Sequence, residues 1–122
     1  MPNFQFQVLA VRRAWAAANK DTLVRFVRAL ADGFSFVRAD ANRAEVIQAM
    51  VDLTGSPPDI ARQTLTLYFE PDRGVVPKQG EINLAGLAQV IAFMGEGRLI
   101  APPLPTPERF VDLQYLRAAG VE

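Results

Sequence analysis

Polar and apolar residues alternate at the start of the chain. Phe4, Phe6 and Val8 fall on one side of an extended segment, and the intervening glutamines fall on the other. A period of two, carried by aromatic and β-branched residues, is typical of a half-buried β-strand. We therefore predict one strand over Phe4–Val8. Because a single strand cannot satisfy its own backbone N–H and C=O groups, this strand needs a partner.

The residues that follow have helical spacing. A short helix is predicted from Arg12 to Ala18, ending near Asn19. In the next, longer helix the apolar residues recur every three or four positions, Asn19 or Asp21 supplies the N-cap, and Gly33 does not interrupt the pattern. Its predicted buried residues are Leu23, Phe26, Val27, Leu30, Ala31 and Phe34.

Capping signals mark the remaining helices. Asn42 followed by Glu45 resembles a capping box, and the helix that it begins is predicted to end at Gly55. Ser56, ahead of two prolines, is predicted to cap the next helix, which finishes near residues 69–71. After a loop at 71–80, we predict one helix from Asn83 to Gly95 or Gly97 and a last helix from about Glu108 to Ala119.

These elements predict a mainly α fold with one N-terminal strand followed by five or six helices. No internal repeat or linker divides the chain, so we expect a single domain over residues 1–122. A strand without a partner among helices indicates part of a larger fold, because secondary-structure layers must pack on one another. The aromatic residues at helical spacing are assigned to the core: Trp15, Phe26, Phe34 and Tyr68.

Composition removes several function classes. Thirteen Lys and Arg balance thirteen Asp and Glu, and a net charge of +0 argues against a nucleic-acid partner. The chain has no Cys and no His, so thiolate chemistry, sulfur-bound zinc and the usual general base near neutral pH are excluded. We expect no metal, no cofactor and no catalytic residue; an enzyme using carboxylates is the remaining catalytic alternative.

Arg12 and Arg13 are the candidate ligand-binding residues. They stand where the predicted strand gives way to a helix, a place where α/β folds often bind ligands, and guanidinium groups suit an anion. The alternative is that both are solvated residues of the first turn. The segment 102–105, Pro-Pro-Leu-Pro, can dock on an aromatic groove or serve as a stiff connector. Four carboxylates match no calcium-loop spacing and are interpreted as caps or solvated turns: Asp59, Glu70, Asp72 and Glu81.

Four segments, in this order and spacing, resemble one protein family. They are FQFQVLAVRRAW at 4–15, LVRFVRA at 23–29, GEINLAGL at 80–87 and PTPERFVDLQYL at 105–116. Together they are similar to the C-terminal portion of ABC-importer solute-binding proteins of the nitrate, sulfonate, taurine and thiamine-precursor type. The resemblance covers the chain from about Asn3 to Gly120.

The resemblance implies a non-catalytic, two-lobed receptor outside the cytoplasmic membrane. Such a receptor binds a small anionic or heteroaromatic solute in its cleft, such as a sulfonate, nitrate or a pyrimidine thiamine precursor, and delivers it to an ABC permease. This chain corresponds only to a C-terminal fragment of that type II periplasmic-binding-protein fold, without the N-terminal lobe. A periplasmic location follows from the resemblance; because no export signal is visible, a natural truncation would be cytoplasmic.

A fragment of this kind leaves apolar faces uncovered, which favours association. We therefore predict a homo-oligomer, formed through exposed helix faces and through the unpaired strand, with Phe4, Phe6 and Val8 at the interface. The alternative function is a standalone helical module for self-association or partner contact, derived from such a receptor and without ligand binding.

Overall fold

A computed structural model describes residue 5, residues 7–69 and residues 78–121. Helices make up 68% of that part, which places the chain in the mainly α class. In chain order the elements are α1 (Arg13–Ala18), α2 (Lys20–Arg38), η1 (Asp40–Asn42), α3 (Arg43–Thr54), α4 (Pro58–Tyr68), α5 (Leu84–Glu96), η2 (Pro107–Arg109) and α6 (Gln114–Ala119), where η marks a 3-10 helix.

The predicted N-terminal strand is wrong. Gln5, Gln7 and Val8 have no regular secondary structure, no strand occurs in the described part of the chain, and Phe4 and Phe6 lie outside it. A strand needs a second strand to complete its backbone hydrogen bonds, and the described residues supply none. Side-chain bonds hold the segment instead: Gln5 accepts the backbone N–H of Asn83 at 2.9 Å and donates to the carbonyl of Gln7 at 2.7 Å.

The five helices predicted between residues 12 and 97 are confirmed, with ends close to the predicted ones. The α2 helix continues through Gly33, as its apolar spacing required. The α3 helix ends at Gly55, whose φ of 67° is the left-handed conformation that glycine adopts without steric cost. Pro58 starts α4, where its fixed φ suits the first turn, and Phe69 ends it.

Three residues predicted as caps make no side-chain capping bond, although Asn19 and Asn42 stand at the N-cap positions of α2 and α3. Asn19 donates to a carbonyl of the preceding turn, Asn42 donates to the carbonyl of Phe36 at 2.9 Å, and the Ser56 hydroxyl pairs with that of Thr54 at 2.8 Å. The physical reason at Asn42 is the 3-10 turn η1, which gives its backbone a helical conformation already. The side chain then faces back to α2 and does not reach the free N–H groups ahead of it.

The last predicted helix is split into η2 and α6. The carboxylate of Asp112 accepts the backbone N–H of Gln114 at 3.3 Å and its side-chain amide at 2.7 Å. A short acidic side chain that bonds the local backbone competes with a continuous helix and favours a new start. Gly120, with a φ of 81°, then ends α6.

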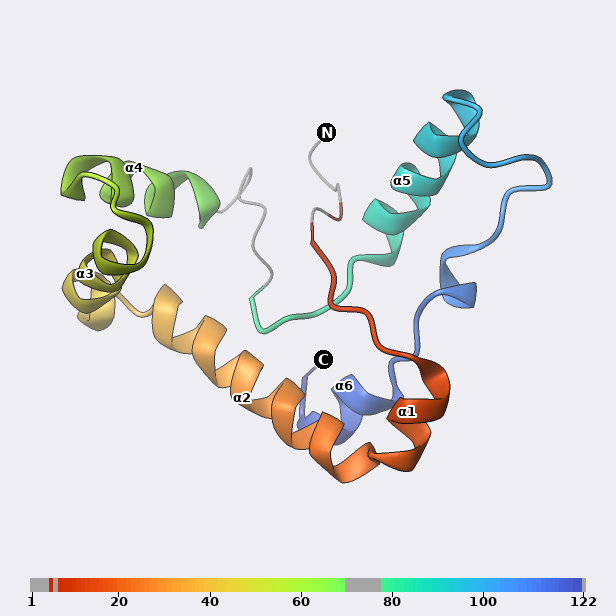
Figure 1. Ribbon diagram of the computed structural model, residues 1–122, viewed down its shortest axis with the longest axis horizontal. Helices are drawn as coiled ribbons and strands as arrows, with labels where there is room; N and C mark the ends of the chain where they lie inside the picture. The colour runs from red at the N-terminus through yellow and green to blue at the C-terminus, as the bar shows by residue number, and fades with distance from the viewer. Residues whose placement is uncertain (1–4, 6, 70–77, 122) are drawn as a thin grey trace.

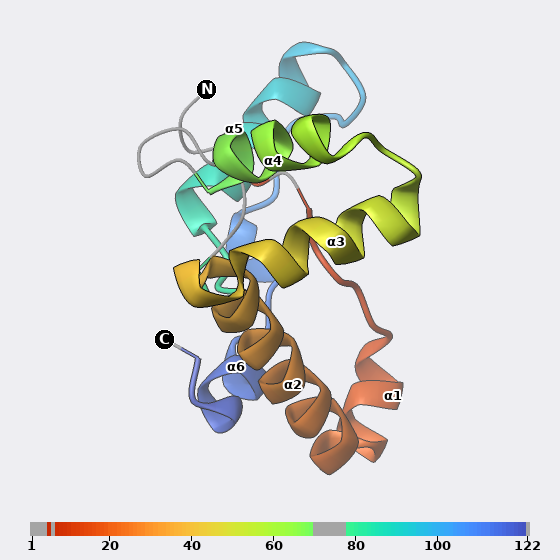
Figure 2. The ribbon, with the colours of Figure 1, turned by 90° about the vertical axis from the view of Figure 1, so that its left-hand side faces the viewer.

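The helices are arranged openly around α2 (Figure 1). The α3–α4 pair lies beyond the C-terminal end of α2, α5 lies on the other side of the molecule, and α1 and α6 gather toward the N-terminal half of α2. Figures 1 and 2 both show α6 alongside α2, and these two helices are in close contact, as are α3 with α4 and α5 with η2. Among the described residues, no close approach joins α5 to α2, α3 or α4.

The core is correspondingly small. Ala31 of α2 is buried with Ala119 and Val121, and half-buried Val24, Val27 and Leu116 surround them. Within the described ranges, no large side chain is completely buried. The core assignment of three aromatic residues is therefore wrong: exposed fractions of 45%, 52% and 45% are found for Trp15, Phe26 and Tyr68.

Asn83, where the helix was predicted to begin, caps α5: its side-chain oxygen accepts the N–H of Gly86 at 2.9 Å. We expect Asn83→Ala to lower the free energy of unfolding by about 1 kcal/mol, because one N–H of the first turn loses its acceptor. Asn83→Asp keeps an acceptor and should retain the stability. Urea unfolding followed by far-UV circular dichroism measures both; equal losses in the two variants would contradict the capping role.

Candidate functional site

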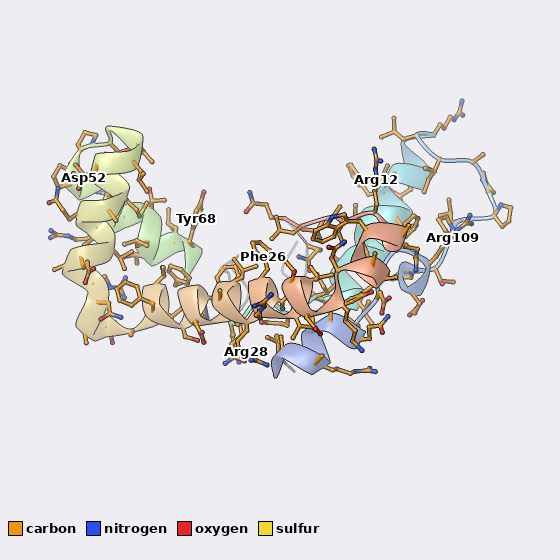
Figure 3. All side chains as sticks on the ribbon, turned by 60° about the horizontal axis from the view of Figure 1, so that its bottom comes forward. Arg12, Phe26, Arg28, Asp52, Tyr68 and Arg109 are labelled. Carbon is orange, nitrogen blue, oxygen red and sulfur yellow. The ribbon has the colours of Figure 1, made fainter. Side chains whose placement is uncertain are left out.

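The two candidate arginines lie where α1 meets η2. Arg12 is the N-cap residue of α1 and Arg13 its first residue, and both are exposed. Arg13 donates from Nη2 to the backbone carbonyl of Arg109 at 2.6 Å, which ties α1 to η2. Figure 3 shows Arg12 and Arg109 at the same end of the molecule. Their role toward a solute stays a prediction, with Arg12 the better placed because one arm of Arg13 already holds η2.

Two surface hollows of the described chain lie away from these arginines and are open to solvent. One, of about 350 Å³, follows a single face of α4; the other, of about 480 Å³, lies along the N-terminal part of α2 beside α6. A site that holds a small molecule tightly encloses most of its surface, which neither hollow does. Their lining residues are Arg62, Gln63, Thr66 and Leu67 in the first and Lys20, Asp21, Val24, Arg25 and Ala118 in the second.

The acidic residues do not form a cation site where the structure describes them. No three of the described Asp and Glu side chains gather as metal ligands, and Glu70 and Asp72 lie outside the described residues. Asp59 stands in the first turn of α4, as a cap-region carboxylate does. Glu81 accepts the backbone N–H groups of Lys78 and Gln79, each at 2.7 Å.

The proline-rich segment packs back onto the helix before it. A Cβ atom added to Gly95 of α5 would lie 2.8 Å from both methyl carbons of Leu104. The Leu104 side chain therefore occupies the space that the glycine leaves open, and it joins the connector to α5. This contact agrees with the connector interpretation of the segment 102–105.

Exposed apolar surface is the most pronounced feature of the molecule. Exposed large hydrophobic residues occur along the whole described chain: Val8, Leu9, Val11, Trp15, Phe26, Phe36, Leu53, Ile60, Leu67, Tyr68, Phe93, Leu99, Leu104 and Phe110.

One part of this exposed apolar surface was not predicted from the sequence. Phe26, Ala29, Gly33 and Phe36 are all exposed and follow one another at intervals of three, four and three residues along α2; we call them the α2 stripe. Figure 3 shows Phe26 projecting from the side of α2 away from Arg28 and α6. The signal was present in the sequence, because α2 carries a second apolar stripe opposite the one centred on Ala31.

The interface role predicted for Phe4, Phe6 and Val8 stays a prediction, although the strand that was to carry it is not observed. Val8 is exposed but belongs to no strand, and Phe4 and Phe6 lie outside the described residues. Association through strand pairing is therefore not supported, and the exposed helix faces are the other part of that prediction.

Comparison with protein-family models, curated proteins and solved structures finds no match to this chain. Within the described ranges, no helix combines the length and the apolar content needed to cross a membrane.

The bonds that Glu81 accepts predict a pH dependence. Partial burial raises its pKa, but the backbone N–H groups of Gln79 and Lys78, helped by the charge of Arg38, lower it below the ordinary value. The resulting stabilisation is complete above the ordinary glutamate pKa of about 4.3 and is lost as the pH falls through the lower, folded-state value. Urea unfolding from neutral to acidic pH should show this loss, and Glu81→Gln should reduce it.

The matched control for Glu81 is Glu96→Gln at the exposed end of α5, which should keep the pH dependence of the wild type. A Glu81→Gln variant with the full acid destabilisation of the wild type would show that other carboxylates are responsible.

Proposed function

We propose that the chain acts as the helical C-terminal part of a non-catalytic, small-solute-binding protein of an ABC importer. The order and spacing of four sequence segments suggest this family, and the structure contributes one supporting observation: the described helices bury only a small core and leave many large apolar side chains exposed. In such a receptor, solute specificity arises where two lobes meet around the ligand, and closure requires contacts from both. The exposed helix faces of this chain are then surfaces that pack against further protein.

The supporting observation is quantitative. Leu53, Leu99 and Leu9 keep exposed fractions of 86%, 73% and 70% in separate parts of the described chain, and extensive exposed apolar surface marks places where further protein packs. The described residues also contain no buried polar or charged side chain, so the interior is not organised around an internal polar site. Both features fit a packing element better than an independent binding pocket.

The proposed solute is a small anion or heteroaromatic compound, and its proposed partner after binding is the ABC permease. Arg12 is the residue of this chain that we assign to the solute. It is exposed at the junction that leads into α1, and its guanidinium offers planar, paired donors to a sulfonate, nitrate or carboxylate. In a receptor of the proposed class, the chain would work outside the cytoplasmic membrane.

A second candidate is a helical self-association or partner-binding module without a ligand. The observation that favours it is the shape of the hollows, which lie on one or two helices and enclose little. This alternative accounts for the same apolar faces but requires no solute, so a direct binding measurement separates the two.

Thermal unfolding of the full chain in the presence of nitrate, taurine or an aminopyrimidine tests the proposed function. A solute that binds the folded state stabilises it by about 2.7 kcal/mol at a hundredfold excess over its dissociation constant. We expect at least one of the three to raise the melting temperature with saturation. Arg12→Ala should abolish the rise caused by an anion, because the charged donor is gone.

Arg117→Ala on α6 is the matched control, since it removes an exposed arginine at a distance in the chain from the proposed contact and should leave the rise unchanged. Three flat titrations would favour the module without a ligand. A rise that persists in Arg12→Ala would refute the role of that residue.

A further inference from the structure

The α2 stripe is self-complementary. Along α2 the order of its side chains is large, small, small, large, from Phe26 through Ala29 and Gly33 to Phe36. Residue 31 is the midpoint of both the two phenylalanines and the two small residues. A twofold axis at the level of residue 31 therefore brings Phe26 of one α2 opposite Phe36 of a second α2, and Ala29 opposite Gly33.

The spacing is that of helices that pack in pairs. Alternating intervals of three and four residues keep side chains on one seam, and each can insert between residues of a facing helix. Small residues at the centre let two backbones approach closely, while the aromatic side chains cover the ends. The space above Gly33 is empty, because a Cβ atom added there would meet nothing within 4 Å.

The stripe lies on a side of α2 that stays exposed among the described residues, and the helix is already anchored on the opposite side. Ala31, between the two small residues of the stripe, is buried against the C-terminal segment on the opposite side of α2. Phe26 and Phe36 keep exposed fractions of 52% and 43%. An anchored helix loses little further conformational freedom on binding, which removes one of the usual costs of association.

From this geometry we infer that α2 pairs antiparallel with α2 of a second copy of the same chain, through Phe26, Ala29, Gly33 and Phe36. Pairing about a twofold axis would bury the exposed Phe26 and Phe36 of both copies, so four aromatic side chains leave water, and a self-complementary surface is what a closed twofold dimer requires. The net charge of +0 adds no long-range repulsion between copies. The inference depends only on α2 and does not require the proposed solute function.

Sedimentation equilibrium of the full chain tests the pairing. The wild type is expected to be a dimer at micromolar concentration, and Phe26→Glu is expected to weaken it by about a hundredfold or more, because a buried aromatic contact is lost at both ends. Phe93→Glu on α5 is the matched control: Phe93 is as exposed, at 61%, but lies outside the α2 stripe, so the dimer should persist. Phe36→Glu repeats the test at the other end of the stripe, and circular dichroism verifies the helix content of each variant.

Cross-linking tests the register, and the absence of cysteine in the chain makes it specific. An oxidised mixture of Ala29→Cys and Gly33→Cys chains should give mainly the mixed disulfide, since these two positions face each other only in the antiparallel pair. A monomeric wild type, polydisperse aggregates, or a dimer that survives both glutamate variants would overturn the inference. Disulfides mainly between identical chains would overturn the antiparallel register.

Discussion

The packing of the C-terminal segment against α2 is the contact on which the tertiary structure depends. Ala31, Ala119 and Val121 are the buried centre of that contact, and they join residues some ninety positions apart in the chain. Arg28 adds a hydrogen bond from its guanidinium to the carbonyl of Ala118 at 3.4 Å. Because these buried side chains are small, the two segments approach closely, but little apolar area is removed from water. Each Å² of buried apolar area contributes about 25 cal/mol, so the stabilisation from this contact is modest. The C-terminal segment thus covers one side of the longest helix, and Gly80 lies beside Phe34 and Leu30 of the same helix.

Apart from two long-range hydrogen bonds, Arg13 to the carbonyl of Arg109 and the N–H of Asn83 to Gln5, the other described contacts between helices join elements close in sequence. The α3 helix pairs with its neighbour α4, and α5 is linked to η2 and to Leu104 of the following connector. Elements that are adjacent in sequence pack first on one another because closing a short loop costs little entropy. Without a further layer to cover them, the outer faces of these pairs keep their apolar residues in water, which is the physical source of the proposed interactions.

Both functional proposals arise from this incomplete burial, but they concern different parts of the exposed surface. The solute proposal concerns the exposed arginine ahead of α1 and the faces that would meet the remainder of a receptor. The dimer inference concerns the outer side of α2 alone. A paired α2 still leaves Phe93 on α5, Leu67 on α4 and Val8 near the N-terminus exposed, so self-association and packing within a larger assembly are compatible.

Helix positions were determined by the sequence itself, because they depend on local signals: the three- and four-residue spacing of α2, Gly55 after α3, Pro58 at the start of α4 and the Asn83 cap of α5. The alternation of polar and apolar residues at the N-terminus was also a real local pattern. A strand, however, forms only when a second strand pairs with it, and a local pattern cannot provide that second strand. The exposure of Trp15, Phe26 and Tyr68 was likewise a tertiary outcome, since helical spacing defines a face but not what covers it. Only the folded chain decided that one side of α2 meets Ala119 and Val121 while the other, with Phe26 and Phe36, faces solvent.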